Sequence, residues 1–490
     1  MKLTLTYTFV LLTLVAGTWL MLEAGARFNR QRPAAEAAQS VPADSAAAAR
    51  PGSPAPAHAG GGLREKLKEP LAILLTQLAV IIIVARLFGW LFRKVGQPSV
   101  IGEMVAGIVL GPSALGALSP ATGGFLFPAS SMGVLGLLSQ VGVILYMFVV
   151  GMELNARHLR EGVRTAILVS HSGIVVPFLL GGALSAVIYR SAASAEVPFT
   201  AFALFVGTAM SITAFPVLAR ILEEKGMSKS RLGSTAIACA AVDDVTAWCL
   251  LAFVVAVVRA EGVWAAVPTV ILAGLFAAFM LLVLRPRLGR RLKGGAEEGT
   301  QGRGLAAAVL PFVFACAWFT ETVGVHAFFG AFLAGVVMPE DAGLRSHLRG
   351  RLEALSTGAL LPVFFAFTGL RTQLSLLGDW QSWLMCGAII AVATVSKLGG
   401  GALAARWTGM NWRDSLSLGV LMNTRGLMEL IVLNIGYDLG VLPARIFSMM
   451  VFMAIITTLM AGPLLSRLNF KAHGERALLS ASSPNQPVDV

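Results

Sequence analysis

From about residue 71 onward, the chain is a succession of apolar segments, each long enough to cross a lipid bilayer as a helix. A helix rises about 1.5 Å per residue, so roughly 20 residues span the hydrocarbon core. Only 13% of the residues are charged, about half the share found in soluble domains. The sequence therefore predicts an all-α polytopic membrane protein, and it excludes a cytosolic enzyme, a disordered chain and a nucleic-acid-binding protein. We expect about thirteen transmembrane helices, at 71–92, 98–116, 131–154, 165–189, 198–219, 232–258, 263–284, 304–320, 322–338, 355–370, 381–405, 414–436 and 446–466.

The four cysteines all lie in apolar stretches, and their spacing fits neither a disulfide framework nor a zinc site. We expect no cofactor. The net charge of +12 is explained by basic loops on the inner side of a membrane protein, without a nucleic acid or another polyanion as partner.

The composition divides the chain into four parts. Residues 1–26 form an apolar stretch that is either a signal peptide or an extra N-terminal helix. Residues 27–66 are rich in Ala, Pro and Gly and predict a disordered linker. Residues 67–468 hold the membrane domain, and residues 469–490 form a short polar tail.

Lysine and arginine are distributed unevenly among the connections between segments. If the segment at 71–92 starts outside, most basic residues fall in the inner connections and the tail. The outer connections then carry only Arg190, Arg259, Arg371 and Arg445. Because the excess of basic residues marks the cytoplasmic side, we expect the linker outside and the tail inside. Arg371 is then a charge at the outer membrane boundary.

Asp243 and Asp244 lie near the middle of the sixth segment, where an ionisable side chain is costly and marks a functional site by default. Adjacent helical residues point about 100° apart, so one carboxylate can face a neighbouring helix while the other faces a cavity. The alternative is a pair of core carboxylates with only a structural role. We favour an ion site, because adjacent carboxylates repel each other and a structural role needs only one.

Lys397 is a lone basic residue within the eleventh segment. A long lysine side chain can extend its ammonium to the membrane surface, which would make it a structural feature only. We instead interpret Lys397 as the counter-charge of the aspartate pair.

Two segments contain features that interrupt a helix in mid-membrane. In the fifth, Pro216 removes a backbone hydrogen bond and frees a carbonyl near Ile212, close to the hydroxyls of Ser211 and Thr213. Irregular backbone at this depth is tolerated only where it is buried in protein or lines a cavity.

The twelfth segment is interrupted by a run of polar and charged residues, which comprises Asn423, Thr424, Arg425, Gly426 and Glu429. Arg425 and Glu429 are four residues apart, so they share one helix face and can pair. Segments four to six and eleven to thirteen then form two triplets, each with an interrupted middle helix. The offset of seven segments gives the triplets opposite membrane orientations, which predicts an inverted repeat with two crossing helices at an ion site.

Several stretches resemble the monovalent cation:proton antiporter-2 family. They are QPSVIGE at 97–103, GIVLGP at 107–112, FVVGMEL at 148–154 and GAFLAG at 330–335. The stretches TAFPVLAR at 213–220 and MNTRGLMEL at 422–430 resemble the branch that contains plant cation/proton exchangers and their bacterial relatives. The resemblance covers about 71–468 and implies a dimeric, elevator-type sodium/proton antiporter fold.

By this resemblance, Asp244 matches the carboxylate that binds the ion and the proton. Asp243 matches the preceding carboxylate, which pairs with a basic residue that Lys397 matches. The plant branch usually has asparagine at the position of Asp243, so this chain is more similar to the electrogenic bacterial antiporters.

We therefore expect a transporter of the bacterial inner membrane, and not an enzyme, that exchanges a monovalent cation for protons by alternating access. Na⁺ is the preferred cation, K⁺ or Li⁺ are alternatives, and the lipid bilayer and a second copy of the chain are the expected partners. Asp243 and Asp244 would bind the metal ion (Na⁺ or K⁺), with Ser211 and Thr213 beside them. A cation channel is a further alternative. An intramembrane aspartyl protease needs aspartates on two facing helices, which adjacent residues cannot provide.

Overall fold

The computed structural model describes residues 16–20, 23, 69–153, 163–194, 196–227, 230–260, 262–292, 301–339 and 342–481. Apart from residues 16–20 and 23, the expected signal peptide or extra helix at 1–26 lies outside the described residues. The expected linker at 27–66 and the last part of the tail, 482–490, lie outside them as well. All regular secondary structure in the described part of the chain is helical.

Most of the expected segments correspond to one long helix each. These are α3 (Pro70–Lys94), α4 (Ser99–Leu110), α7 (Ala129–Glu153), α8 (Val163–Ala192), α11 (Arg231–Arg259), α12 (Val263–Ala278), α14 (Gln301–Val323), α15 (Ala327–Val336), α17 (Leu361–Arg371), α18 (Trp380–Trp407) and α21 (Ala444–Ala481). Two segments are each split into half-helices, α9 (Phe199–Ser211) with α10 (Phe215–Glu224), and α19 (Trp412–Met422) with α20 (Leu427–Asp438).

Further helices lie in the connections or extend the helices named above. They are α5 (Leu115–Leu118), α6 (Pro120–Leu126), α13 (Arg285–Leu292), α16 (Ala342–Leu355), the π-helices η2 (Phe279–Leu284) and η3 (Ser356–Leu360), and the 3₁₀-helix η4 (Leu374–Leu377).

Helix length gives a smaller number of complete spans than the sequence suggests. Within the described residues, ten helices are long and apolar enough to cross a membrane, and the bent pair α19 and α20 adds an eleventh. The apolar parts of α14 and α15, Ala308–Val323 and Ala327–Val336, are shorter. The count of thirteen transmembrane helices therefore stays a prediction.

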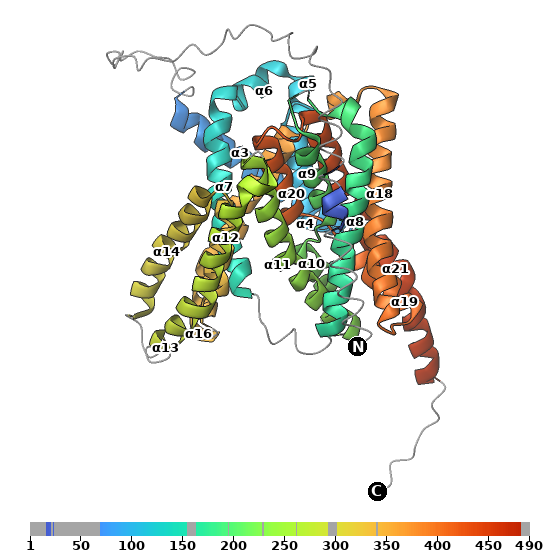
Figure 1. Ribbon diagram of the computed structural model, residues 1–490. Helices are drawn as coiled ribbons and strands as arrows, with labels where there is room; N and C mark the ends of the chain where they lie inside the picture. The colour runs from blue at the N-terminus through green and yellow to red at the C-terminus, as the bar shows by residue number, and fades with distance from the viewer. Residues whose placement is uncertain are drawn as a thin grey trace, which may run out of the picture.

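The helices group into two bundles. Figure 1 shows α7, α12, α14 and α16 on the left, α8, α18, α19 and α21 on the right, and the half-helices with α11 between them. The first bundle joins α3, α4, α7, α14, α15 and α17, and the second joins α8, α9, α10, α11, α18, α19, α20 and α21. We call them the scaffold bundle and the core bundle.

Close glycine contacts make each bundle tight internally. In the scaffold bundle, a Cβ added to Gly107 of α4 would lie 2.2 Å from the Ala366 carbonyl oxygen of α17. In the core bundle, a Cβ on Gly419 of α19 would lie 2.6 Å from the Leu398 carbonyl oxygen of α18. Small residues let helix backbones approach closely in membranes, so neighbouring helices within a bundle are positioned backbone against backbone.

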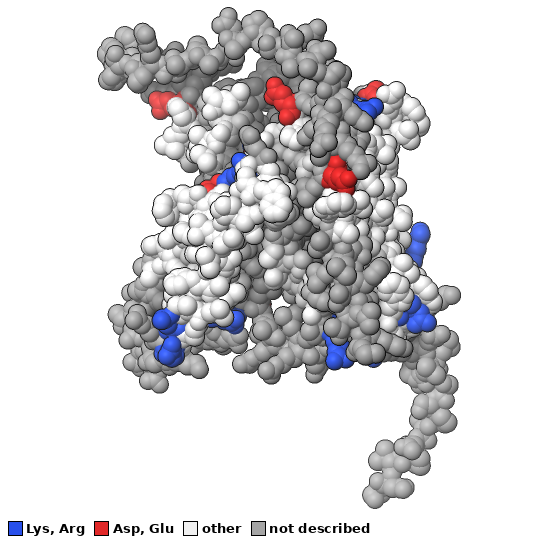
Figure 2. Space-filling model, viewed as in Figure 1, with Lys and Arg blue, Asp and Glu red and all other residues white. Residues whose placement is uncertain are grey.

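Charged side chains are segregated on the surface of the molecule. On the face shown in Figure 2, Lys and Arg gather mostly along the lower edge, whereas Asp and Glu lie in the upper half. A broad white zone of uncharged residues separates them. Such a zone is the surface expected to face lipid.

Candidate ion-binding site

Two interrupted helices meet at the centre of the core bundle. The helix α9 ends at Ser211 and α10 begins at Phe215, while α19 ends at Met422 and α20 begins at Leu427. Pro216 lies in the first turn of α10, where its missing N–H group costs nothing. It therefore lies at the start of a second half-helix, and the fifth segment is interrupted, as the sequence predicts.

The two interruptions are hydrogen-bonded to each other. The Ala214 N–H donates to the Thr424 carbonyl oxygen at 3.0 Å. The Thr213 hydroxyl donates to the Met422 carbonyl oxygen at 2.8 Å. Extended segments from the fifth and twelfth segments thus cross, and the ends of four half-helices meet. We call this place the crossing.

Two buried cations cap the C-terminal end of α9. Arg425 donates to the carbonyl oxygens of Ala209 and Met210 at 2.9 and 2.8 Å. The Lys397 ammonium donates to the Ser211 carbonyl oxygen. The last carbonyls of a helix have no partner within the helix and carry partial negative charge, so both cations stabilise the interrupted end.

Asp243 is held by three donors from different elements. Its Oδ2 atom is 3.0 Å from Lys397 Nζ and accepts a bond from the Thr213 N–H at 3.0 Å. Its Oδ1 atom accepts a bond from the Ser170 hydroxyl of α8 at 3.1 Å. Lys397 and Asp243 are both fully buried, so the lysine does not extend to the membrane surface. Ser170 was not predicted as a site residue, although a serine within an apolar segment indicates a buried polar contact.

Asp244 is buried next to Asp243 but is less completely paired. Its Oδ1 atom has no hydrogen-bond partner in the described part of the chain. The backbone N–H of Phe215, the first residue of α10, is close enough to hydrogen-bond the carboxylate. A helix N-terminus attracts negative charge, and the remaining oxygen is free to bind a proton or a cation.

Arg425 and Glu429 form the ion pair expected from their spacing. Arg425 Nη1 is 3.4 Å from Glu429 Oε1, and both side chains are fully buried. The Glu429 oxygens make no hydrogen bond within the described residues. Thr458 of α21 accepts a bond from the Arg425 N–H and donates to its carbonyl oxygen, each at 2.9 Å. Thr458 therefore holds the backbone of Arg425 in place, and the sequence did not predict this role.

The remaining predicted residues stay at the crossing without contacting the aspartates. The Ser211 hydroxyl donates to the Gly207 carbonyl of its own helix at 2.6 Å, so only its backbone takes part. The Thr424 hydroxyl donates to the Leu421 carbonyl at 2.8 Å. The Asn423 Oδ1 atom is buried and has no hydrogen-bond partner among the described residues.

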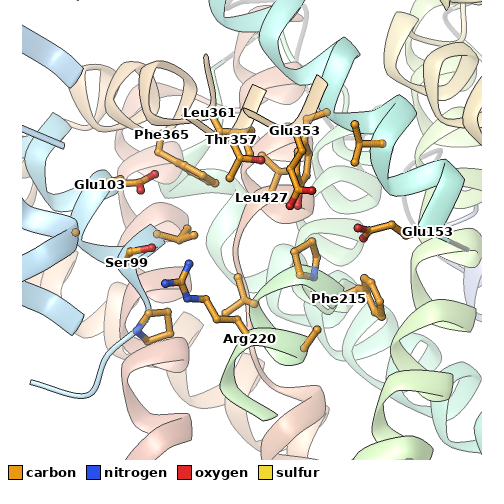
Figure 3. A pocket seen from close by; sticks show the side chains of 18 of the residues that line it. Ser99, Glu103, Glu153, Phe215, Arg220, Glu353, Thr357, Leu361, Phe365 and Leu427 are labelled. Carbon is orange, nitrogen blue, oxygen red and sulfur yellow. The ribbon is translucent and has the colours of Figure 1, made fainter. Parts of the chain in front are cut away.

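A cavity of about 980 Å³ leads to the crossing from one side of the molecule. Its lining includes Phe215 and Leu427, the first residues of α10 and α20. Figure 3 shows Glu103 of α4 and Arg220 of α10 on opposite walls, both pointing into the cavity. Phe215, whose backbone N–H is next to Asp244, lines this cavity together with Arg93, Arg220, Arg345 and Arg349. The cavity therefore reaches a neighbour of the buried aspartate pair.

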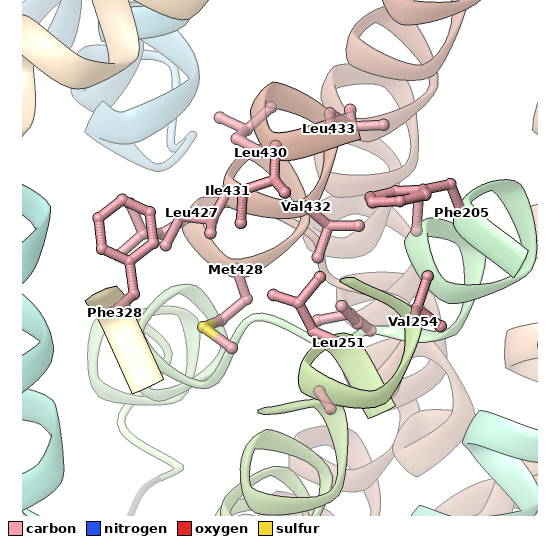
Figure 4. Close-up of a cluster of buried hydrophobic side chains, with 14 of the residues drawn as sticks. Phe205, Leu251, Val254, Phe328, Leu427, Met428, Leu430, Ile431, Val432 and Leu433 are labelled. Carbon is pink, nitrogen blue, oxygen red and sulfur yellow. The ribbon is translucent and has the colours of Figure 1, made fainter. Parts of the chain in front are cut away.

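The opposite side of the crossing is filled by apolar side chains. Figure 4 shows Leu427 to Leu433 of α20 packed among Phe205 of α9, Leu251 and Val254 of α11, and Phe328 of α15. Beyond them lies a pocket of only about 20 Å³ between the bundles. That volume is about enough for one water molecule, so this side is closed.

Comparisons with known proteins identify the family. The family model described as "Sodium/hydrogen exchanger, transmembrane" matches residues 80–471. The Na⁺/H⁺ antiporter NhaS4 of Synechocystis sp. is 43% identical over 81% of this chain and 97% of its own length. The sodium proton antiporter MjNhaP1 of Methanocaldococcus jannaschii shares the fold, with a TM-score of 0.60 at 13% identity, over 82% of this chain and 99% of that one.

Eukaryotic antiporters are also similar. Cation/H⁺ antiporter 17 of Arabidopsis thaliana is 39% identical over 81% of this chain, and K⁺/H⁺ antiporter 1 of Saccharomyces cerevisiae is 32% identical over 85%. The matched region spans about half, 48%, of each of these two proteins. The chain belongs to the sodium/hydrogen exchanger family, and it is a multi-pass membrane transporter of the monovalent cation:proton antiporter type rather than an enzyme.

Proposed function

We propose that the protein exchanges Na⁺ for protons, and that both ligands neutralise the same buried charge. Three carboxylates, Asp243, Asp244 and Glu429, and two cations, Lys397 and Arg425, are buried at the crossing. When all five are ionised, one negative charge remains without compensation. An unpaired charge in a membrane interior costs several kcal/mol, so one monovalent cation or one proton must fill the deficit. The proposal rests on this uncompensated charge. Because a cation and a proton compete for the same negative charge, binding of one releases the other.

Asp244 is the group that receives either ligand. One of its oxygens has no partner among the described residues, and the nearby Phe215 lines the open cavity, whereas Asp243 is already bound by three donors. Na⁺ prefers hard oxygen ligands, and the aspartate carboxylates, the free Asn423 oxygen and water are of that kind. In the ion-free state we assign a proton to Asp244 and an ion pair to Asp243 and Lys397.

The Asp243–Lys397 pair sets the number of protons per cation. If the cation recruits Asp243 as well as Asp244, Lys397 loses its partner and a buried ammonium without a counter-charge releases its proton. Two protons then leave for each Na⁺ that binds, the Na⁺-bound site keeps one uncompensated negative charge, and exchange moves net charge. If Lys397 keeps its proton, exchange is one for one and electroneutral.

Alternating access is proposed to occur by movement of the core bundle against the scaffold bundle. The glycine contacts within each bundle support motion of the bundles as units. The open cavity and the closed pocket lie on opposite sides of the crossing, and both are formed between the bundles. We further propose that the protein forms a homodimer through the scaffold bundle.

We propose the bacterial inner membrane as the location, with the cavity open to the cytoplasm. The support is the basic edge of the molecule in Figure 2 and the arginines that line the cavity, since basic residues mark the cytoplasmic side. The linker at 27–66 would then be periplasmic and the tail cytoplasmic.

Proton flux into proteoliposomes, with Na⁺, K⁺ and Li⁺ offered in turn, tests the proposal. We expect Na⁺ to drive proton movement at lower concentration than K⁺. A response to K⁺ alone would favour the second candidate, K⁺/H⁺ exchange, which the similarity to the yeast K⁺/H⁺ antiporter supports. Cation flux without any proton counterflow would contradict exchange altogether and indicate a channel.

A further inference from the structure

One arginine joins the two bundles on the closed side of the molecule. Arg371 is the last residue of α17 in the scaffold bundle. Its Nη1 atom is 2.8 Å from Asp438 Oδ1 and donates to Asn434 Oδ1 at 3.0 Å, and both partners belong to α20 of the core bundle. From the sequence alone, Arg371 is expected only as a charge at the outer membrane boundary.

The surroundings of Arg371 fix its position. The guanidinium carbon lies 4.2 Å from the centre of the Phe367 ring and 5.3 Å from that of Tyr437. Asn434 also donates from Nδ2 to the Thr368 hydroxyl of α17 at 2.9 Å, which gives a second bridge between the bundles. We call Thr368, Arg371, Asn434 and Asp438 the outer latch.

The latch crosses the boundary at which the bundles must move. The helix α17 packs mainly against α4 and α7 of its own bundle, whereas α20 packs against α9 and α21. A Cβ added to Gly369 would lie 2.5 Å from the Met104 carbonyl oxygen of α4, so Arg371 is attached to a rigid helix pair. The bonds of Arg371 to α20 therefore connect two units that are each rigid.

The latch also lines the closed pocket. Arg371, Asn434 and Asp438 are among the residues around its 20 Å³ volume. Any motion that widens this pocket into a second access route must separate α20 from α17 and break these bonds. The inner cavity, in contrast, keeps the opposing walls of α4 and α10 apart.

We propose that Arg371 is a positioning residue of the exchange cycle, which holds the outer side closed while the inner side is open. This inference rests on the proposed alternating-access function. Hydrogen bonds to a charged group are strong enough to shift a two-state equilibrium by roughly tenfold or more. Loss of the latch should therefore increase the share of molecules that open to the outside.

Thiol labelling in membranes tests the proposal. Ser139→Cys places a thiol at the closed pocket and Ser99→Cys places one in the open cavity. A membrane-impermeant maleimide is applied from each side, and the parent chain gives the background from its own cysteines. We expect Arg371→Gln to raise the rate at Ser139→Cys by about tenfold and to lower the rate at Ser99→Cys. Asp438→Asn should act in the same direction, and the charge exchange Arg371→Asp with Asp438→Arg should restore the parent pattern.

Arg445→Gln is the matched control. Arg445 of α21 pairs with Asp379 at the start of α18 at 3.4 Å, so this outer ion pair lies within the core bundle. The pKa of Asp379 is lowered by hydrogen bonds from Ser382 and by Arg445, so the pair is intact at neutral pH. Its loss should leave both labelling rates unchanged.

A purely structural role of Arg371 predicts a different result. Arg371→Gln would then lower thermal stability without a reciprocal change in the two labelling rates, and that outcome would overturn the proposal. If Arg371→Gln does not fold, Asp438→Asn and Thr368→Val provide the same comparison. Labelling does not need transport, so unchanged rates would refute the latch alone, whereas absent cation-driven proton flux in the parent chain would refute the antiport function alone.

Discussion

The two sides of the crossing differ sharply although they are built from equivalent half-helices. On one side, α10 faces the scaffold bundle across a cavity of about 980 Å³ with charged walls. On the other, α20 faces it across a pocket of about 20 Å³, sealed by apolar side chains and the outer latch. Under the proposed alternating access, the difference between the sides describes one of two conformations of the protein.

The two sides also differ in where their charged residues lie. The aspartate pair lies at the crossing, and Phe215, whose backbone N–H is next to Asp244, lines the open cavity. The closed side has its ion pair, Arg371 with Asp438, at the last residue of α20.

The largest expected effect follows from removal of the central carboxylate. Asp244→Asn fills the buried charge deficit permanently, because the site is then neutral without a proton or a cation. We expect cation-driven proton flux in proteoliposomes to fall to the level of protein-free liposomes, while expression and thermal stability persist.

Asp414→Asn is the control for this substitution, since Asp414 lies in the first turn of α19 at the surface end of the same bundle. It should retain parent flux. Normal exchange by Asp244→Asn would remove the central role of that residue.

The second prediction concerns the ion pair between Asp243 and Lys397, in which Asp244 takes no part. Lys397→Gln leaves a buried carboxylate without its counter-charge, and breaking a buried pair costs about 3–5 kcal/mol. Uptake of a proton by Asp243 reduces this loss. The double variant Asp243→Asn with Lys397→Gln should be more stable than Lys397→Gln alone.

Thermal stability of the four variants forms a double-mutant cycle. A coupling energy near zero would mean that the pair seen at 3.0 Å contributes nothing, and the assigned geometry of the site would be wrong at its centre.

The third prediction compares how accessible the open cavity and the closed pocket are to a thiol reagent. In the parent chain, the thiol of Ser99→Cys should react with an impermeant maleimide roughly tenfold or more faster than that of Ser139→Cys, as expected when the inward-open state predominates. The cytoplasmic side should be the reactive one for Ser99→Cys. Equal rates at the two positions would show that the closed pocket opens as often as the cavity.

The smallest effect is expected for Asp243→Asn. The variant keeps Asp244, and a buried Lys397 without a carboxylate partner is neutral, so one negative charge still lacks compensation and exchange persists. Exchange should change from electrogenic to electroneutral, with flux reduced only modestly. A voltage-sensitive dye records the response to a Na⁺ jump, and unchanged charge movement would refute the role of Asp243.

The sequence predicted those parts of the site that are costly in a membrane. Asp243, Asp244, Lys397, Arg425 and Glu429 stand out because each is a charge within an apolar segment, and their pairing follows from the need for compensation. The two interruptions were predictable for the same reason, since polar groups and a proline in mid-membrane require a cavity or a protein partner.

Other parts depend on how the helices are rotated against one another, which no single segment specifies. Ser170 and Thr458 are neutral, and burying a hydrogen-bonded hydroxyl costs little free energy. Their presence in apolar segments therefore did not mark them as site residues. The Ser211 hydroxyl was expected at the ion but bonds its own helix. The role of Arg371 depends on the position of α20 beside α17, a contact between segments far apart in the sequence.

Helix lengths were also less predictable than helix positions. The apolar stretch 322–338 is long enough to suggest a full span, but α15 comprises only Ala327–Val336. His326 caps its N-terminus, where the ring accepts a bond from the Phe328 N–H at 3.5 Å. Hydropathy measures how apolar a stretch is, and it does not register the turn that ends the preceding helix at Val323.

Proton release on cation binding to the purified protein tests the central claim most directly. In weakly buffered detergent solution with a pH indicator, addition of Na⁺ should release one proton per bound ion, or two if Lys397 also loses its proton. Asp244→Asn should release none. If Na⁺ binds to the parent chain with a measurable heat and releases no proton, the two ligands do not compete for one buried charge, and the account is contradicted.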